Sequence, residues 1–132
     1  IVAECGGFMY LHRTMEDMEH RIYEMAGVVP GECFYTGKLV RFGYIELEEK
    51  KANFLPKKVN IKGHEFHYFD STANGDECVA LKPVSGKKYD CIFDEKSCFV
   101  GFPHLYYPSA PQFAENFVKK AKNYADRKNQ KL

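Results

Sequence analysis

The first seven residues constrain the fold more than any other part of the chain. Ile1–Ala3 is an apolar segment typical of the end of a buried strand, and Glu4-Cys5-Gly6-Gly7 leads directly into a helical pattern. A strand that becomes a helix within one or two residues is a feature of α/β folds. The pattern therefore predicts an α/β domain in which Cys5 occupies the tip of a sharp turn.

Helical spacing at both ends of the chain predicts two helices. Near the start, apolar residues recur at Phe8, Leu11, Met15 and Met18, which predicts one helix through all four. Near the end, Ser109-Ala110-Pro111-Gln112 has the form of a capping box. We expect the final helix to begin there.

The region between Tyr23 and Cys98 consists of short apolar runs separated by turn residues, which predicts short strands. In Lys38–Glu48 the apolar alternation changes phase beside Gly43, which predicts a bulge or bend. We find no internal repeat and no linker, and 132 residues is an ordinary length for one domain. Residues 1–132 are therefore expected to form a single domain.

Charge and composition argue against several classes of protein. Lysine and arginine number 19 against 18 acidic residues, so no excess charge favours nucleic acid or an anionic membrane as a partner. No apolar run approaches the roughly 20 residues that cross a bilayer. The five cysteines are odd in number and lack a C-x-x-C pair. Neither a disulfide framework nor a metal site is predicted, and a cytoplasmic location fits best.

Cys5 is the first candidate for chemistry. A side chain at the tip of a tight turn is presented to a ligand, and Gly6 and Gly7 let the backbone approach that ligand closely. The positive end of the following helix is expected to favour thiolate over thiol. The N–H of Gly6 could then serve as an oxyanion donor. The alternative is a buried cysteine before an ordinary helix start.

Two histidines supply candidate bases. A thiolate that attacks an acyl carbon needs a group that can accept and return a proton, and imidazole has the appropriate pKa. His64 and His67 have opposite parity in an extended strand, so only one can face a given point. Glu65 shares the face of His67 and could orient it. The alternative is a pair of partly buried, hydrogen-bonded histidines. His104, where a strand gives way to a loop, could line the rim of a pocket.

Four segments in the same order resemble the glutamine amidotransferase domain of the cobyrinic acid a,c-diamide synthase family. They are Ala3–Leu11, Arg41–Tyr44 (R-F-G-Y), Gly63–Tyr68 (G-H-E-F-H-Y) and Gly101–Ser109. The resemblance covers nearly the whole chain. It implies a class I glutamine amidotransferase fold, with a flavodoxin-like sheet, flanking helices and an N-terminal truncation.

The resemblance also implies roles for residues. Cys5 matches the nucleophile that forms a glutamyl thioester and releases ammonia. His67 matches the catalytic histidine, while His64 is the weaker candidate. Glu65 is expected to be a third member of the site. Gly6, Gly7 and His104 are expected to bind the oxyanion or the substrate.

The implied partners are glutamine, a corrin substrate and an N-terminal synthetase domain of the same polypeptide. That domain uses ATP and Mg²⁺ to activate the a and c carboxylates of the corrin. The chain opens on an apolar strand without an initiator Met, so we expect it to be the C-terminal part of the amidotransferase domain, with the synthetase domain absent. We expect no cofactor in this piece and little glutaminase activity from it alone. A homodimer is compatible with the resemblance.

Three alternatives remain open at this point. The first is an a,c-diamide synthase for a nickel tetrapyrrole. The second is a non-catalytic module that keeps the fold and binds a synthetase partner. The third is a cysteine hydrolase that acts on peptides or esters.

Overall fold

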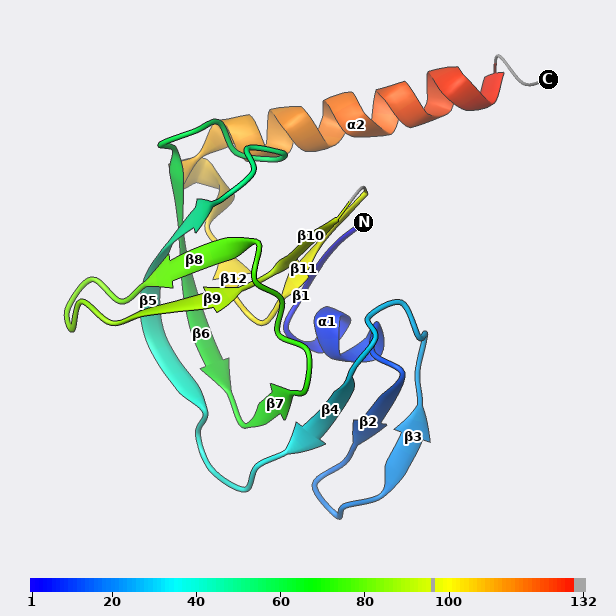
Figure 1. Cartoon of the computed structure of the whole chain (residues 1–132), viewed down its shortest axis with the longest axis vertical. Helices are drawn as coiled ribbons and strands as arrows, with labels where there is room; N and C mark the ends of the chain where they lie inside the picture. The colour runs from blue at the N-terminus through cyan, green and yellow to red at the C-terminus, as the bar shows by residue number, and fades with distance from the viewer. Residues whose placement is uncertain (96, 130–132) are drawn as a thin grey trace.

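The strands that surround Cys5 belong to the first of three sheets. A computed structural model describes residues 1–95 and 97–129 (Figure 1). In the first sheet the order is β1-β11-β10, with bounds β1 (Val2–Glu4), β11 (Cys98–Gly101) and β10 (Phe93–Glu95). β1 runs parallel to β11, and Glu4 pairs with Gly101. The helix α1 (Gly6–Tyr10) starts one residue after Cys5, so the predicted sharp turn is confirmed.

The second sheet is the largest and is antiparallel throughout. Its order is β12-β6-β5-β8-β9. The bounds are β5 (Arg41–Glu49), β6 (Asn60–His67), β8 (Cys78–Leu81), β9 (Lys88–Cys91) and β12 (His104–Leu105). The third sheet has the order β3-β2-β4-β7. Its bounds are β2 (Thr14–Glu16), β3 (Ile22–Glu24), β4 (Glu32–Tyr35) and β7 (Phe69–Ser71).

β11 separates two hydrophobic clusters. Phe99 packs into one cluster, with Leu47, Phe54 and Phe113, while Val100 packs into the other. Successive side chains of a strand point to opposite faces, so one short strand serves both cores. The second cluster also contains Phe8 of α1, which anchors the turn at Cys5 to the rest of the molecule.

The long first helix predicted from Phe8 to Met18 is wrong. α1 ends at Tyr10, and Met15 lies in β2, where it pairs with Tyr23 of β3 and Cys33 of β4. The backbone N–H of Val29 bonds to the carbonyl of Leu11 at 2.7 Å, so a neighbouring segment takes over the hydrogen bonding there. Sheet pairing thus overrides a local helical spacing.

Of the bulge or bend predicted at Gly43, the bulge does not form, although the backbone is distorted there. β5 and β6 pair residue for residue from Arg41↔His67 to Glu48↔Asn60, with no extra residue on either strand. Gly43 has φ +100°, a conformation that favours glycine. The alternation of buried and exposed side chains along β5 does not change phase at Gly43, because Phe42 and Tyr44 are both exposed on the outer face of the sheet.

The final helix, α2 (Pro111–Asn129), forms where the spacing predicts it, after a 3₁₀ turn, η1 (Tyr107–Ser109). The capping box does not form as predicted. The hydroxyl of Ser109 donates to the carbonyl of Tyr106 at 2.7 Å and accepts from the N–H of Lys62 at 2.9 Å. It therefore ties the turn to β6. No helix in the described part of the chain is both long enough and apolar enough to cross a membrane.

Glu4 connects the strand before Cys5 to the segment that follows β12. Its Oε1 accepts hydrogen bonds from the hydroxyl of Tyr107 at 2.5 Å and from the N–H of Leu105 at 3.3 Å. Burial, together with the neighbouring Glu4 carboxylate, raises the pKa of Tyr107, so its hydroxyl stays a donor. This contact fixes the end of β1, and with it the position of Cys5.

We expect Tyr107→Phe to lower the free energy of unfolding by about 1–2 kcal/mol, because Glu4 loses its phenol donor in a half-buried site. Tyr106→Phe is the matched control, since Tyr106 is 61% exposed and should change stability by less than about 0.5 kcal/mol. Urea unfolding measures both variants. Equal stability of the two would show that the Glu4 contact contributes nothing.

Candidate active site

Cys5 occupies a strained turn. Its backbone has φ 44° and ψ −107°, a conformation that a residue with a side chain rarely adopts. Its N–H donates to the carbonyl of Gly101 at 2.9 Å, which holds the turn against the end of β11. Such strain is kept only where the surrounding structure enforces it, and it is common at functional sites.

The effect expected from the helix start on Cys5 is present but outweighed. Burial raises the pKa of the thiol above its ordinary value, the N–H of Gly6 lowers it, and the negative charges of Glu4 and Glu65 raise it further. α1 contains only five residues, and its end cannot offset the loss of hydration. The thiol therefore needs a proton acceptor to become a thiolate near neutral pH.

His67 lines the same cavity as Cys5. The cavity has a volume of about 440 Å³, and Gly6 also contributes to its wall. The other lining residues are Met9, Met18, Tyr35, Phe66, Tyr68 and Phe69. Segments far apart in the sequence thus place a thiol, an imidazole and a backbone N–H around one space.

The ring of His67 is held on two sides. It stacks on Phe102, with ring centroids 4.1 Å apart and planes 7° from parallel. Its Nδ1 lies 2.7 Å from the carbonyl oxygen of Phe69. A carbonyl only accepts, so the neutral ring carries its proton on Nδ1 and leaves Nε2 as the acceptor. Nε2 has no hydrogen-bond partner among the described residues.

Glu65 lies next to Nε2 of His67, and its side chain is fully buried. Its Oε1 is 3.6 Å from Nε2 of His67 and 3.7 Å from the guanidinium of Arg41. Its Oε2 accepts a hydrogen bond from Tyr89 and lies 3.6 Å from Nζ of Lys82. Burial favours the neutral acid, but His67, Tyr89 and Arg41 outweigh it and lower the pKa of Glu65.

The other predicted residues lie away from this cavity wall. β12 pairs His104 with His64 on β6, and the two rings are 5.1 Å apart. Nδ1 of His104 is 3.8 Å from Glu4 Oε2, and neither histidine lines the cavity of Cys5. Gly7 is exposed in α1 and is likewise not part of the cavity wall.

Sequence analysis missed the surroundings of Glu65. Lys82 and Tyr89 look like ordinary residues of a polar hairpin, and only the antiparallel pairing of β5, β8 and β9 brings them to the carboxylate. For Arg41 there was a clue, because its position along β5 is the one that pairs with His67 of β6. Phe102 gave none, since its stacking on His67 brings together two segments that are far apart in the sequence.

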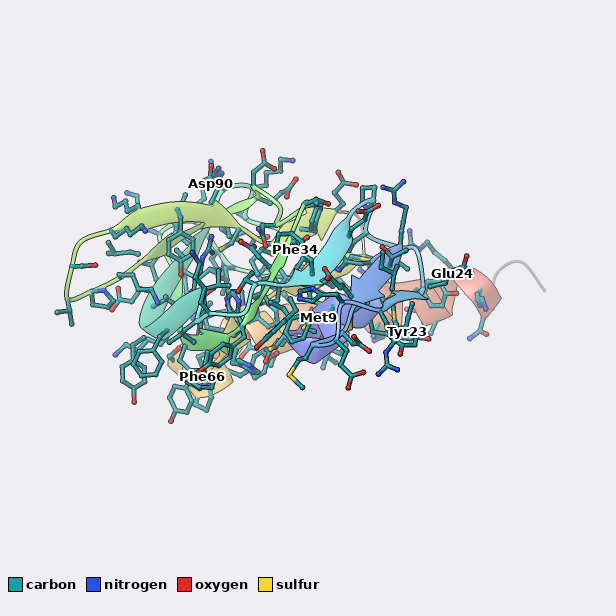
Figure 2. All side chains as sticks on the ribbon, turned by 90° about the horizontal axis from the view of Figure 1, so that it is seen from below. Met9, Tyr23, Glu24, Phe34, Phe66 and Asp90 are labelled. Carbon is teal, nitrogen blue, oxygen red and sulfur yellow. The ribbon has the colours of Figure 1, made fainter. Side chains whose placement is uncertain are left out.

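The outer face of β5 and β6 carries exposed rings, which we call the outer aromatic face: Phe42, Tyr44, Phe66 and Tyr68. Their exposure ranges from 40% for Tyr68 to 79% for Tyr44. The rings of Phe42 and Phe66 are in contact, with centroids 5.8 Å apart, and Figure 2 shows Phe66 projecting away from the sheet. Phe66 and Tyr68 also line the cavity of Cys5, so the face reaches the mouth of the site.

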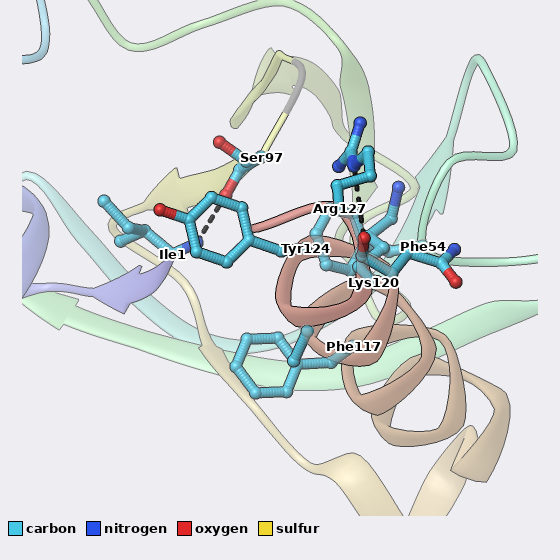
Figure 3. A pocket seen from close by; sticks show the side chains of 9 residues that line it. Ile1, Phe54, Ser97, Phe117, Lys120, Tyr124 and Arg127 are labelled. Carbon is cyan, nitrogen blue, oxygen red and sulfur yellow. Dashed lines mark hydrogen bonds between the residues drawn. The ribbon is translucent and has the colours of Figure 1, made fainter. Parts of the chain in front are cut away.

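A larger cavity of about 620 Å³ lies between α2 and the first residue of the chain (Figure 3). Its wall includes Phe54, Phe117, Lys120 and Tyr124. None of the described residues that line it is a cysteine, a histidine or a carboxylate. In the described part of the chain no group of three or more His, Cys, Asp or Glu is placed to hold a metal ion.

Comparison with known proteins identifies the family. A sequence model of the CobB/CobQ-like glutamine amidotransferase domain matches residues 1–110. A cobyrinate a,c-diamide synthase of Fusobacterium nucleatum is 38% identical over 119 residues, which cover 87% of this chain and 26% of that protein. Those of Caldanaerobacter subterraneus and Salmonella typhimurium are 35% and 30% identical, and each match covers 28% of the relative. The chain thus spans about a quarter of the length of these relatives. It belongs to the CobB/CobQ-like glutamine amidotransferase domain family and has an α/β fold of the class I glutamine amidotransferase type.

Proposed function

We propose that the chain is the glutaminase part of an ATP-dependent cobyrinate a,c-diamide synthase. The observation that carries the proposal is the shared cavity of Cys5 and His67. Cys5 is presented by a strained turn, and His67 is held so that Nε2 is its free acceptor. A thiol whose pKa is raised by burial can react near neutral pH only if such an acceptor takes its proton.

The proposed reaction uses these groups in sequence. Nε2 of His67 takes the proton of Cys5, and the sulfur attacks the side-chain amide carbon of glutamine. The N–H of Gly6 stabilises the oxyanion that forms. His67 returns the proton to the leaving nitrogen, so ammonia departs and a glutamyl thioester remains. Water, deprotonated by His67, then hydrolyses the thioester to glutamate and regenerates the thiol.

The rest of the proposal concerns the use of ammonia. The relatives are named as cobyrinate a,c-diamide synthases. We propose that an ATP- and Mg²⁺-dependent domain of the same polypeptide activates the a and c carboxylates of a corrin, and that ammonia displaces the phosphate. No residue of this chain is assigned to ATP or Mg²⁺. The partners of the site are then glutamine and that domain.

The outer aromatic face supports a contact with the ATP-dependent domain. It is a cluster of exposed aromatic side chains, and apolar patches of this kind mark interaction surfaces. It also adjoins the cavity in which ammonia would form, because Phe66 and Tyr68 belong to both. A domain packed on this face would receive ammonia close to where it is released.

In the full-length enzyme we expect Cys5→Ala to abolish amide formation from glutamine, because the nucleophile is lost, and to spare amide formation from ammonium. Cys98→Ala is the control, since Cys98 is also a half-buried free thiol but lies on β11 and does not line the cavity. Product analysis with each nitrogen source measures both. Glutamine use by the Cys5 variant would rule out this nucleophile.

The pH dependence of Cys5 alkylation tests the role of His67. At pH 7 we expect His67→Asn to slow reaction with iodoacetamide at least about tenfold, because the thiol loses its base. Since burial raises the pKa of Cys5, the deficit should shrink only at alkaline pH, beyond the ordinary range of a cysteine, where the thiol ionises unaided. His64→Asn, on the opposite face of β6, is the control. Mass spectrometry gives the rates; identical pH profiles for wild type and His67→Asn would refute the assignment.

The outer aromatic face is tested by coupling between the two reactions. In the full-length enzyme Phe42→Ser and Tyr44→Ser should lower the ratio of amide formed to glutamate released at least about twofold, because a weakened contact lets ammonia escape. Val84→Ser, fully exposed on the β8–β9 loop, is the control. An unchanged ratio in both aromatic variants would place the contact elsewhere.

A further inference from the structure

Two buried atoms near the site have no hydrogen-bond partner among the described residues. They are Oε1 of Glu65 and Nε2 of His67, and they lie 3.6 Å apart. With the ring proton on Nδ1, both atoms present lone pairs and cannot bond to each other. A proton added to Nε2 would make the ring a cation beside the Glu65 carboxylate, at a distance that suits an ion pair. The site is therefore arranged for an imidazolium, which is the state His67 reaches when it takes the proton of Cys5.

The other oxygen of Glu65 is held by a hairpin that does not reach the cavity. Tyr89 of β9 donates to Oε2, and Lys82, which follows β8, places its Nζ 3.6 Å from the same atom. Lys82 is itself fixed, because its Nζ donates to the carbonyls of Phe42 at 2.9 Å and Gly43 at 3.4 Å. The positive φ of Gly43 belongs to this stretch of backbone.

Arg41 completes the surroundings of the carboxylate. Its guanidinium lies over the ring of Tyr89, 3.9 Å from the centroid, and 3.7 Å from Oε1 of Glu65. Cation–π contact of this kind restrains both side chains. The carboxylate is thus surrounded by side chains of β5, β9 and the residue after β8, and its Oε1 lies between Arg41 and His67.

We propose that Lys82 and Tyr89 are positioning residues that keep Glu65 ionised, with Oε1 directed at His67, so that the imidazolium formed opposite the Cys5 thiolate is stabilised. This rests on the proposed function of Cys5 and His67. No covalent step is added, because the proton moves from Cys5 to Nε2 and Glu65 contributes only its negative charge.

Charge on all sides of Glu65 agrees with this role. The cations facing it are Arg41 from β5 and Lys82 after β8, while Tyr89 from β9 and His67 on its own strand donate or can donate. Burial raises the pKa of Tyr89, so it stays a neutral donor, and burial raises that of Cys91 to about 12. Without the hairpin, burial of Glu65 would be opposed by fewer groups, and its pKa would rise.

NMR titration of the Glu65 carboxyl carbon and the His67 ring provides the test. In the wild type we expect the titration midpoint of Glu65 to lie below the ordinary range of a glutamate, and the chemical shifts of the His67 ring to report that change of charge. Lys82→Met and Tyr89→Phe should each raise that midpoint by about one pH unit or more. Lys88→Met on β9 and Tyr44→Phe on the outer face are matched controls and should leave it unchanged.

Kinetics of the full-length enzyme give the functional readout. Lys82→Met and Tyr89→Phe should lower kcat for glutamine hydrolysis several-fold at low pH, with a deficit that shrinks toward pH 8, and leave KM for glutamine unchanged. Lys82→Arg should restore the wild-type profile, since it keeps the charge. Unshifted midpoints or a pH-independent deficit would overturn the proposal.

The outcomes separate this proposal from the one it rests on. If Cys5→Ala or His67→Asn retained glutamine hydrolysis, the proposed function would fail, whatever the titrations showed. If Cys5→Ala and His67→Asn were inactive but Glu65 had the same midpoint in the wild type and in the Lys82 and Tyr89 variants, only the positioning role of Lys82 and Tyr89 would fail. Should Lys82→Met and Tyr89→Phe not fold, the wild-type titration decides alone. A Glu65 midpoint above the ordinary range of a glutamate, or His67 ring shifts that do not respond to the Glu65 charge, contradicts the proposal.

Discussion

The site depends on the end of one short strand. The carbonyl of Gly101, the last residue of β11, accepts the N–H of Cys5, and the next residue, Phe102, supports the ring of His67. Two consecutive residues therefore set the positions of groups that are far apart in the sequence. Gly101 has no room for a side chain, because a Cβ there would lie 2.5 Å from Cδ1 of Ile92. The close packing at this point gives the strained turn at Cys5 a rigid support.

Burial raises the pKa of both acids of the site, but its net outcome differs between them. For the Cys5 thiol it raises the pKa, and the surroundings do not compensate, so the nucleophile depends on a neighbouring base. For Glu65 it is outweighed by nearby donors and cations, so the carboxylate stays charged although it is fully buried. Loss of hydration favours the neutral form of both groups. The difference is that Lys82, Arg41 and Tyr89 surround only the second group.

The two faces of β5 and β6 carry different kinds of side chain. Their inner face carries Arg41, Glu65 and His67, while their outer face carries Phe42 and Phe66. In many sheets the apolar side faces the core and the polar side faces water. Near the site of this protein the polar side chains lie on the buried face and the aromatic rings on the exposed face. This is possible because the buried polar groups pair with one another. The exposed rings are then left for a partner, in keeping with the proposed contact.

Several features of the protein follow from the sequence alone. The sharp turn at Cys5, the α/β class, the strands of the central region and the final helix are all local patterns, and the structure contains each of them. The opposite parity of His64 and His67 also follows from strand geometry, and burial alternates along β6 accordingly. The resemblance in four segments points to the family that the comparisons show.

Other features were decided only by the tertiary structure. The helical spacing from Phe8 to Met18 gave way to β2, since pairing with β3 and β4 supplies hydrogen bonds that a helix would otherwise provide. The pKa of Cys5 depends on burial by distant residues, and the setting of Glu65 depends on a hairpin more than a dozen residues away. Local spacing fixes which side chains share a face. How deeply these side chains are buried, and which charged groups become their neighbours, depends on which strands pack together.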